Sequence, residues 1–426
     1  MSHLLPLWMV RPLACGVLAA ALGTGLRAQA PAAGPGGWRV SGELAQGVDS
    51  NIELALDHPQ ADTTTQLQLG LERSWSGPHW SFRASYDPTA VAYARHPKLD
   101  YLSNAYQQVW SYALGPHTQI IWRSDAERYP ERGGAPTGGL APLAATANAS
   151  QAMALGSVLT GANTNFALNH QYSLRSNWSA SVSGGLQAFS ADTSLGTAGA
   201  SGFSPTALLG HTHTVAANLG WSYRVGSATS VQVGAEQSFM TYSGLGQQVR
   251  YSNVQASVQQ KIGSVLSLQL GAGPAWNHTL TRAAAAAAFH LPGTSYAANA
   301  ILAAHSGRSQ YGLSWQHGTQ AGFTPGGLTT DVLALQYSLQ WSPSWSAGLS
   351  VGQSRNAAAS TTAAGGPTQD SGFASAQLLC RVASRWSLQA NASYFTQAEP
   401  TARGATQPFR RLQASIGLSY TSGGAQ

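Results

Sequence analysis

The sequence predicts an all-β fold: a transmembrane antiparallel β-barrel of about 18 strands, with 16 to 18 as the expected range. Three observations predict it. Apolar and polar residues alternate with a period of two through most of the chain, as in strands with two unlike faces. Only 9% of the residues are charged, whereas soluble proteins have about 25%. Short and long links alternate between the strand segments, as do the short periplasmic turns and long extracellular loops of outer-membrane barrels.

The N-terminal thirty residues have the features of an export signal. Arg11 ends a short basic region, an apolar run extends from Pro12 to Leu26, and Ala28-Gln29-Ala30 offers small residues for cleavage. A lipoprotein acylated at Cys15 is the alternative, which the apolar run beyond that cysteine disfavours. We expect the following organisation: a signal peptide at 1–30, a short periplasmic segment at 31–37, the barrel at 38–420 and a C-terminal extension at 421–426.

Cleavage of the signal would lower the formal charge from +6 to +4, since 20 basic and 16 acidic side chains would remain. So small an excess predicts no nucleic-acid partner. Cys380 would then be the single cysteine, which leaves no intrachain disulfide.

The alternation is clearest in Leu333–Trp341, where the odd positions are apolar and Gln336, Ser338 and Gln340 lie between them. Leu266–Leu270 follows the same pattern. Applied along the whole chain, it predicts eighteen strands, at 38–48, 65–75, 79–93, 99–113, 117–130, 163–175, 177–190, 211–224, 228–241, 249–261, 265–277, 296–305, 308–317, 330–340, 344–354, 372–383, 385–396 and 409–420.

The links contain turn residues where they are short, as in Gly77-Pro78, Gly263-Ser264 and Ser342-Pro343. Eight links of this kind alternate with nine longer ones. Both ends of the barrel therefore fall on the short-turn side, which we expect to face the periplasm.

A soluble propeller or sandwich would also contain many short strands. Its water-facing side would normally carry Lys, Glu, Thr and Arg, but here the polar face is Gln, Ser, Asn and Gly. The other face is Leu, Val, Ala and aromatic. An apolar face against outer-membrane lipid and a neutral polar face toward a watery interior account for both, and predict the outer membrane of a Gram-negative-type bacterium.

Tryptophans gather beside the short turns, as expected for an aromatic girdle at the periplasmic membrane interface. An aromatic core at the turns of a soluble domain is the alternative. The candidates for the girdle are Trp75, Trp80, Trp110, Trp178, Trp221, Trp341, Trp345 and Trp386.

Charged residues at inward positions cluster in the first five predicted strands. Opposed charges on a pore wall orient solutes and select ions, although the same pairs can simply hold the wall together. The candidates for the pore lining or constriction are Glu43, Glu72, Arg83, Asp87, Arg123, Asp125 and Glu127, with Arg39 beside them.

The longest predicted loop, Glu131–Ala162, has apolar residues such as Leu140, Leu143 and Met153 along it and no charge after Arg132. In general porins the third long loop folds into the lumen, and this one is similar in position and length. We expect it to narrow the pore, with a disordered surface loop as the alternative.

The last predicted strand, Gln413–Tyr420, resembles the terminal strand that barrel-assembly machinery recognises, with Ile416, Leu418 and Tyr420 as the apolar signal. It departs from that pattern because Thr421–Gln426 follow the aromatic residue. After the first strand, Gly42 and Gly47 precede Asp49-Ser50-Asn51, which resembles the opening of the beta-barrel porin 2 family. The resemblance implies a pore-like barrel with an unassigned solute.

The sequence offers no motif for catalysis. His211 and His213 share one side of a strand without a third ligand nearby, so we expect no metal site. His170 lies among apolar residues, and no nucleophile elbow, phosphate loop or HExxH motif occurs. We therefore predict no enzyme activity and no cofactor.

The function that these features predict is a porin-like channel for passive passage of small hydrophilic solutes. Two alternatives stay open: a barrel that exports a neutral exopolysaccharide, and a non-conducting structural or adhesive barrel. The expected partners are outer-membrane lipid, the barrel-assembly machinery, small solutes or neutral saccharides and, by analogy with porins, further copies of the chain. An active siderophore transporter is disfavoured, because no plug domain precedes the first strand.

Overall fold

The structure is a computed structural model, and it describes residues 37–52, 59–131, 157–191, 211–243, 247–280, 294–320, 328–358, 368–397 and 409–422. The predicted signal peptide at 1–30, nearly all of the segment at 31–37 and the final residues 423–426 lie outside this part of the chain. Among the described residues, no helix is long and apolar enough to cross a membrane.

Nineteen strands and one short 3-10 helix, η2 (Pro97–Leu99), make up the described part of the chain. The strands are β1 (Trp38–Asp49), β2 (Asp62–Ser76), β3 (Trp80–Tyr86), β4 (Thr89–Tyr93), β5 (Tyr101–Gly115), β6 (Thr118–Glu131), β7 (Ser157–Gln171), β8 (Ser176–Ala191), β9 (His211–Arg224), β10 (Thr229–Tyr242), β11 (Gln247–Ile262), β12 (Leu266–Thr279), β13 (Thr294–Ser306), β14 (Ser309–Gln320), β15 (Leu328–Ser342), β16 (Trp345–Ala358), β17 (Thr368–Arg381), β18 (Trp386–Gln397) and β19 (Phe409–Thr421).

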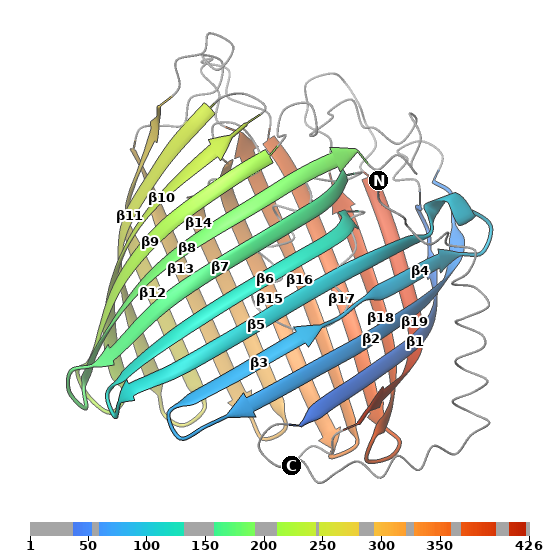
Figure 1. The fold of residues 1–426 in the computed structure, drawn as a ribbon, viewed down its shortest axis with the longest axis horizontal. Coiled ribbons are helices and arrows are strands. Elements are labelled where there is room, and N and C mark those ends of the chain that lie inside the picture. Colours follow the sequence, from blue (N-terminus) through green and yellow to red (C-terminus); the bar gives the residue numbers. More distant parts are fainter. Residues whose placement is uncertain are drawn as a thin grey trace.

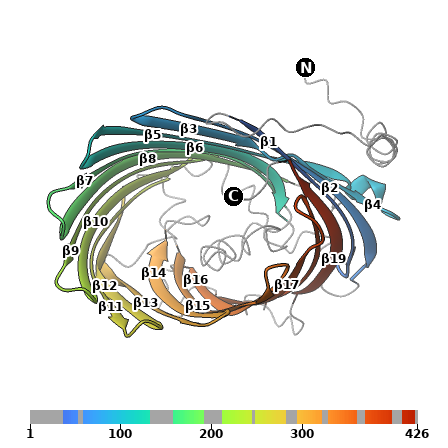
Figure 2. The ribbon, with the colours of Figure 1, turned by 90° about the horizontal axis from the view of Figure 1, so that it is seen from below.

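These strands form one closed antiparallel barrel, which Figure 1 shows from the side and Figure 2 along its interior. Closure comes from β1, which pairs with β2 on one edge and with β19 on the other. β3 and β4 lie end to end between β2 and β5, and together they occupy one strand position. The barrel thus has 18 strand positions, and the predicted fold class is confirmed.

The interruption between β3 and β4 falls at Asp87 and Pro88. Proline has no backbone N–H for the ladder, so a regular strand cannot continue through it unchanged. Hydrogen bonds nevertheless hold the break in the sheet: Asp87 N donates to Ala105 O at 2.8 Å, and Leu69 N donates to Pro88 O at 3.0 Å.

One predicted strand was misplaced. The segment predicted at 163–175 is β7, Ser157–Gln171, so the predicted third long loop at 131–162 shortens to the link 132–156, which lies outside the described residues. The alternation fails at this point because Leu159 faces the barrel interior and is buried, leaving both faces of the strand apolar. All other strands begin and end within four residues of their predicted bounds.

The eight short turns join β2 to β3, β5 to β6, and so on around one rim, as Figure 1 shows at the lower edge of the barrel. Gly263 and Gly307 lie in two of them with φ of 64° and 56°, a left-handed conformation that glycine adopts without steric cost. β1 begins and β19 ends at the same rim, where Val40 N donates a 2.7 Å hydrogen bond to Ser422 Oγ.

Residue pairing assigns the strand side chains to two faces. The face that holds Glu43 also holds its partners Gln68 and Ser419, and continues around the barrel to Asn218, Gln255 and Gln336. Every buried strand residue of the described part lies on this face. A single closed sheet can bury side chains only on its inner face, so this face points inward. The outward face carries most of the exposed large apolar residues, including Leu219, Leu335 and Ile416.

A small apolar core lies inside the barrel at the long-loop end. It consists of Ile52, Val91, Tyr93, Leu99 and Phe395, all buried, with Tyr101 and Phe373 packed against it. The core thickens the wall beside the seam between β1 and β19.

Candidate pore and its lining

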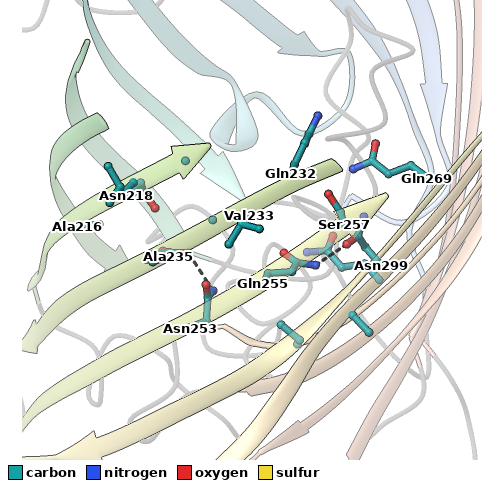
Figure 3. Close-up of a pocket in the computed structure, with 18 of the residues that line it drawn as sticks. Ala216, Asn218, Gln232, Val233, Ala235, Asn253, Gln255, Ser257, Gln269 and Asn299 are labelled. Atoms are coloured by element: carbon teal, nitrogen blue, oxygen red, sulfur yellow. Dashed lines mark hydrogen bonds between the residues drawn. The ribbon is translucent and has the colours of Figure 1, made fainter. Parts of the chain in front are cut away.

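A cavity of about 1130 Å³ lies against the inner wall formed by β8–β15. Figure 3 shows its amide side chains on neighbouring strands, with Asn218, Asn253, Gln255 and Asn299 among those labelled. The inward amides that line it are Asn177, Asn218, Gln232, Asn253, Gln255, Gln269, Asn299 and Gln316, and the inward hydroxyls are Ser179, Thr214, Ser222, Ser238, Ser257 and Ser314.

Glu236 is the one carboxylate that lines this cavity. Asn253 Nδ2 donates to Glu236 Oε2 at 3.2 Å and to the Tyr251 hydroxyl at 3.0 Å. On β11 as well, Gln255 Nε2 donates to Oδ1 of Asn299, which lies on β13. Amides both donate and accept hydrogen bonds. This wall can therefore replace water around an uncharged polar solute, whether the solute group is a donor or an acceptor.

All seven charged residues predicted for the pore lining lie on the inward face: Glu43, Glu72, Arg83, Asp87, Arg123, Asp125 and Glu127. They do not form one cluster. Arg83 Nη2 donates to Glu72 Oε2 at 2.7 Å, while Arg123 Nε is 4.0 Å from Asp125 Oδ1. Glu43 lies across the closing seam, where it accepts a hydrogen bond from Gln389.

The two ion pairs are open to the interior. The side chain of Arg83 is 61% exposed and that of Arg123 is 55% exposed. Exposed pairs of this kind contribute only about 0–1 kcal/mol to stability. Their charges therefore remain available to act on solutes in the lumen.

Near the long-loop end, the inward face is buried and includes several apolar side chains. Tyr242 and Val249 on β10 and β11, and Val332 and Ala334 on β15, are each at most 3% exposed. The sequence predicts a mostly neutral and polar inward face, and these four apolar residues depart from that prediction. The aromatic and aliphatic residues at inward positions of these strands were the available signal.

The eight tryptophans predicted for a girdle lie on the outward face beside the short turns. Trp386 packs on Tyr420 with ring centroids 5.0 Å apart, and Trp75 packs on Phe82 at 5.2 Å. The guanidinium of Arg73 lies 4.3 Å from the centroid of Trp75 and 4.9 Å from that of Trp38. A cation held over aromatic rings suits a membrane interface, where one side is apolar and the other is wet.

The most buried charged contact was not predicted. Arg411 and Asp49 are 2% and 1% exposed and form an ion pair across the β1–β19 seam. The sequence singles out Asp49 only as part of the Asp49-Ser50-Asn51 motif. Its partner lies 362 positions away, and nothing in the local sequence of β19 indicates the pairing.

The remaining candidates lie on the outward face. Ile416, Leu418 and Tyr420 of the predicted assembly signal project from β19, and His211 and His213 project from β9. Within the described ranges, no three His, Cys, Asp or Glu side chains gather closely enough to hold a metal ion.

Closure, an apolar exterior and a polar inner wall together define a transmembrane β-barrel of the porin type. No protein-family model matches the chain, and no curated protein matches it.

Solved structures with a similar arrangement include OccK9 (OpdG) of Pseudomonas aeruginosa, at 12% identity and a TM-score of 0.46, covering 91% of this chain and 98% of that one. The outer membrane protein OpdK of the same organism is 11% identical, with a TM-score of 0.44. The match covers 90% of this chain and 98% of OpdK. The siderophore receptor PirA of Acinetobacter baumannii is 8% identical, with a TM-score of 0.44. The match covers 90% of this chain and 80% of the receptor.

Proposed function

We propose that this chain is an outer-membrane channel through which small hydrophilic solutes pass by diffusion. The observation that carries the proposal is the inner wall of the 1130 Å³ cavity, where amides and hydroxyls from seven neighbouring strands, β8 to β14, surround a single carboxylate, Glu236. Such a wall has no use in a barrel packed solid, because buried polar groups cost free energy unless they are hydrogen-bonded. It suits a water-filled passage.

The proposal includes the route to the membrane. Residues 1–30 direct export and are removed after Ala30, and β19 is recognised during assembly through Ile416, Leu418 and Tyr420. The short turns then face the periplasm, and the outward tryptophans beside them lie at the inner membrane interface. The chain acts without a cofactor and without catalysis.

At the amide-lined cavity, the wall favours small solutes that are uncharged or weakly charged. The same wall would suit a neutral saccharide, and passage of saccharides is the second candidate function. The apolar inward residues near the long-loop end, such as Tyr242 and Val332, support a lumen that is narrower there than at the short-turn end.

A liposome swelling assay tests the proposal. Proteoliposomes that contain the purified barrel should swell in isotonic arabinose faster than in sucrose, and faster in sucrose than in raffinose, because a narrow lumen sorts sugars by size. A variant with Asn218→Trp and Asn253→Trp would narrow the cavity and should slow swelling in every sugar.

The matched control is Leu219→Trp with Val254→Trp, which adds the same bulk to the outward face of the same two strands. These changes should leave swelling unaltered. Proteoliposomes that swell no faster than empty liposomes in arabinose would contradict the channel and favour a non-conducting barrel.

A further inference from the structure

Three cations gather on the inner wall at the short-turn mouth of the barrel. Arg175, Arg224 and Lys261 line one cavity of about 560 Å³, which adjoins the amide-lined cavity described above and shares Asn177 and Ser222 with it. They come from the β7–β8 turn, the end of β9 and the end of β11, so three segments far apart in the sequence supply one site. None of the three belongs to the charged set that the sequence indicated.

Backbone hydrogen bonds fix the segments relative to one another. Arg224 N donates to Arg175 O at 2.7 Å, and Lys261 N donates to Ala228 O at 2.8 Å. The register places both strand residues on the inward face: Arg224 is opposite Ser230, and Lys261 is opposite Ser267. The charges therefore face the interior and not the lipid.

The site has no acidic side chain to neutralise it. Apart from the three cations, the inward residues that line it are neutral: Gln171, Asn177, Ser222, Ser230 and Gln259. Within the described part of the chain, no carboxylate lies within ion-pair distance of Arg175, Arg224 or Lys261. All three are exposed, so a dissolved ion can reach them.

We propose that this cavity binds a compact anion with two or more negative charges, of the phosphate or polycarboxylate type, at the periplasmic mouth of the barrel. Three unpaired cations repel one another, and a multivalent anion between them removes that repulsion. Two guanidinium groups also present paired N–H donors that match two oxygens of a phosphate or carboxylate. Arginine and lysine side chains line anion and phosphate pores in the same way.

A lipid headgroup is a poor occupant for this site. Lipid lies against the outward face, where Trp221 and Trp178 flank the same turns. An anion held by Arg175, Arg224 and Lys261 must therefore come from the water inside the barrel. The assignment of this anion as a passing solute rests on the proposed channel function, whereas its binding does not.

Isothermal titration of inorganic pyrophosphate into the detergent-solubilised full barrel tests the binding. The variant with Arg175→Gln, Arg224→Gln and Lys261→Gln should bind pyrophosphate at least about tenfold more weakly, because it loses several charge-assisted hydrogen bonds. The matched control has Arg128→Gln, Arg355→Gln and Arg410→Gln, which removes three charges from the outward face near the long loops. It should keep the original affinity within about twofold.

Equal weakening in the two triple variants would overturn the proposal, because the attraction would then reflect net charge alone. Absence of measurable binding at low ionic strength would overturn it as well. Conductance of the same preparation separates the two proposals. Ion conduction without pyrophosphate binding would contradict the anion site and support the channel. Pyrophosphate binding without conduction would contradict the channel and support the anion site.

Discussion

Arg411 and Asp49 form a buried ion pair that joins the last strand of the barrel to the first. Arg411 Nε donates to both carboxylate oxygens of Asp49, at 2.9 and 3.1 Å, and Arg411 Nη2 makes a further contact. Gln413 Nε2 and the backbone N of Asn51 each donate to the same carboxylate at 3.1 Å. A bidentate pair with this support fixes the register of β1 against β19 at the long-loop end.

The first prediction concerns this pair. Arg411→Gln leaves the Asp49 carboxylate buried without its countercharge, so the free energy of unfolding should fall by about 3–5 kcal/mol. Urea titration of the barrel refolded in lipid vesicles measures it. The double variant Arg411→Gln with Asp49→Asn should lose less than the single one, because no buried charge is then left unpaired. A double variant that loses the sum of the two single effects would mean that the residues act independently.

The second prediction tests the assignment of the two faces. Leu219 and Asn218 are neighbours near the middle of β9, one outward and the other inward. Leu219→Arg places a charge against lipid and should destabilise the barrel by about 2–4 kcal/mol. Asn218→Arg places it in the watery interior and should cost less than about 1 kcal/mol. The same unfolding experiment measures both, and comparable losses would contradict the orientation of the strand.

The third prediction concerns close packing between strands. A Cβ on Gly273 would lie 1.8 Å from the carbonyl oxygen of Val254, which is backbone and cannot move aside alone. Gly273→Ala should therefore lower the free energy of unfolding by about 1–3 kcal/mol.

Gly234→Ala is the control for this change, because the nearest atom to its Cβ, the Leu219 carbonyl oxygen, is 3.8 Å away. It should leave stability within about 1 kcal/mol of the original protein. If neither substitution changed the free energy of unfolding, β11 and β12 would not approach each other as closely at Gly273 as the structure shows.

The fourth prediction concerns ion selectivity. Asp125 and Glu127 are inward acidic residues on β6, so Asp125→Asn with Glu127→Gln should shift the reversal potential in a KCl gradient toward that of chloride. Asp331→Asn with Asp370→Asn removes two charges from the outward face and should leave the reversal potential unchanged. An equal shift in both variants would show that the lumen charges have no special role.

The fold could be predicted from the sequence because the strand signal is local. Two unlike faces force alternation, and the short turns contain Gly, Pro and Ser, so seventeen of the eighteen strand positions fall near their predicted places. β7 is the exception, since Leu159 is apolar and inward and hides the alternation where the strand begins.

The site could be predicted only in part. Alternation placed Glu72 and Arg83 on the inner wall, where these two residues form an ion pair. It did not indicate the pair of Asp49 with Arg411, which depends on closure of the barrel. The three mouth cations were missed for a similar reason: Arg175, Arg224 and Lys261 are isolated charges in the sequence, and the barrel brings them together.

Single-channel conductance tests the central claim most directly. Protein purified from the outer membrane of cells that express the full chain would be inserted into a planar lipid bilayer in KCl, and neutral oligosaccharides would then be added. A water-filled channel predicts uniform current steps that sugars small enough to enter reduce reversibly. A correctly folded barrel that inserts and gives no current steps would contradict the claim.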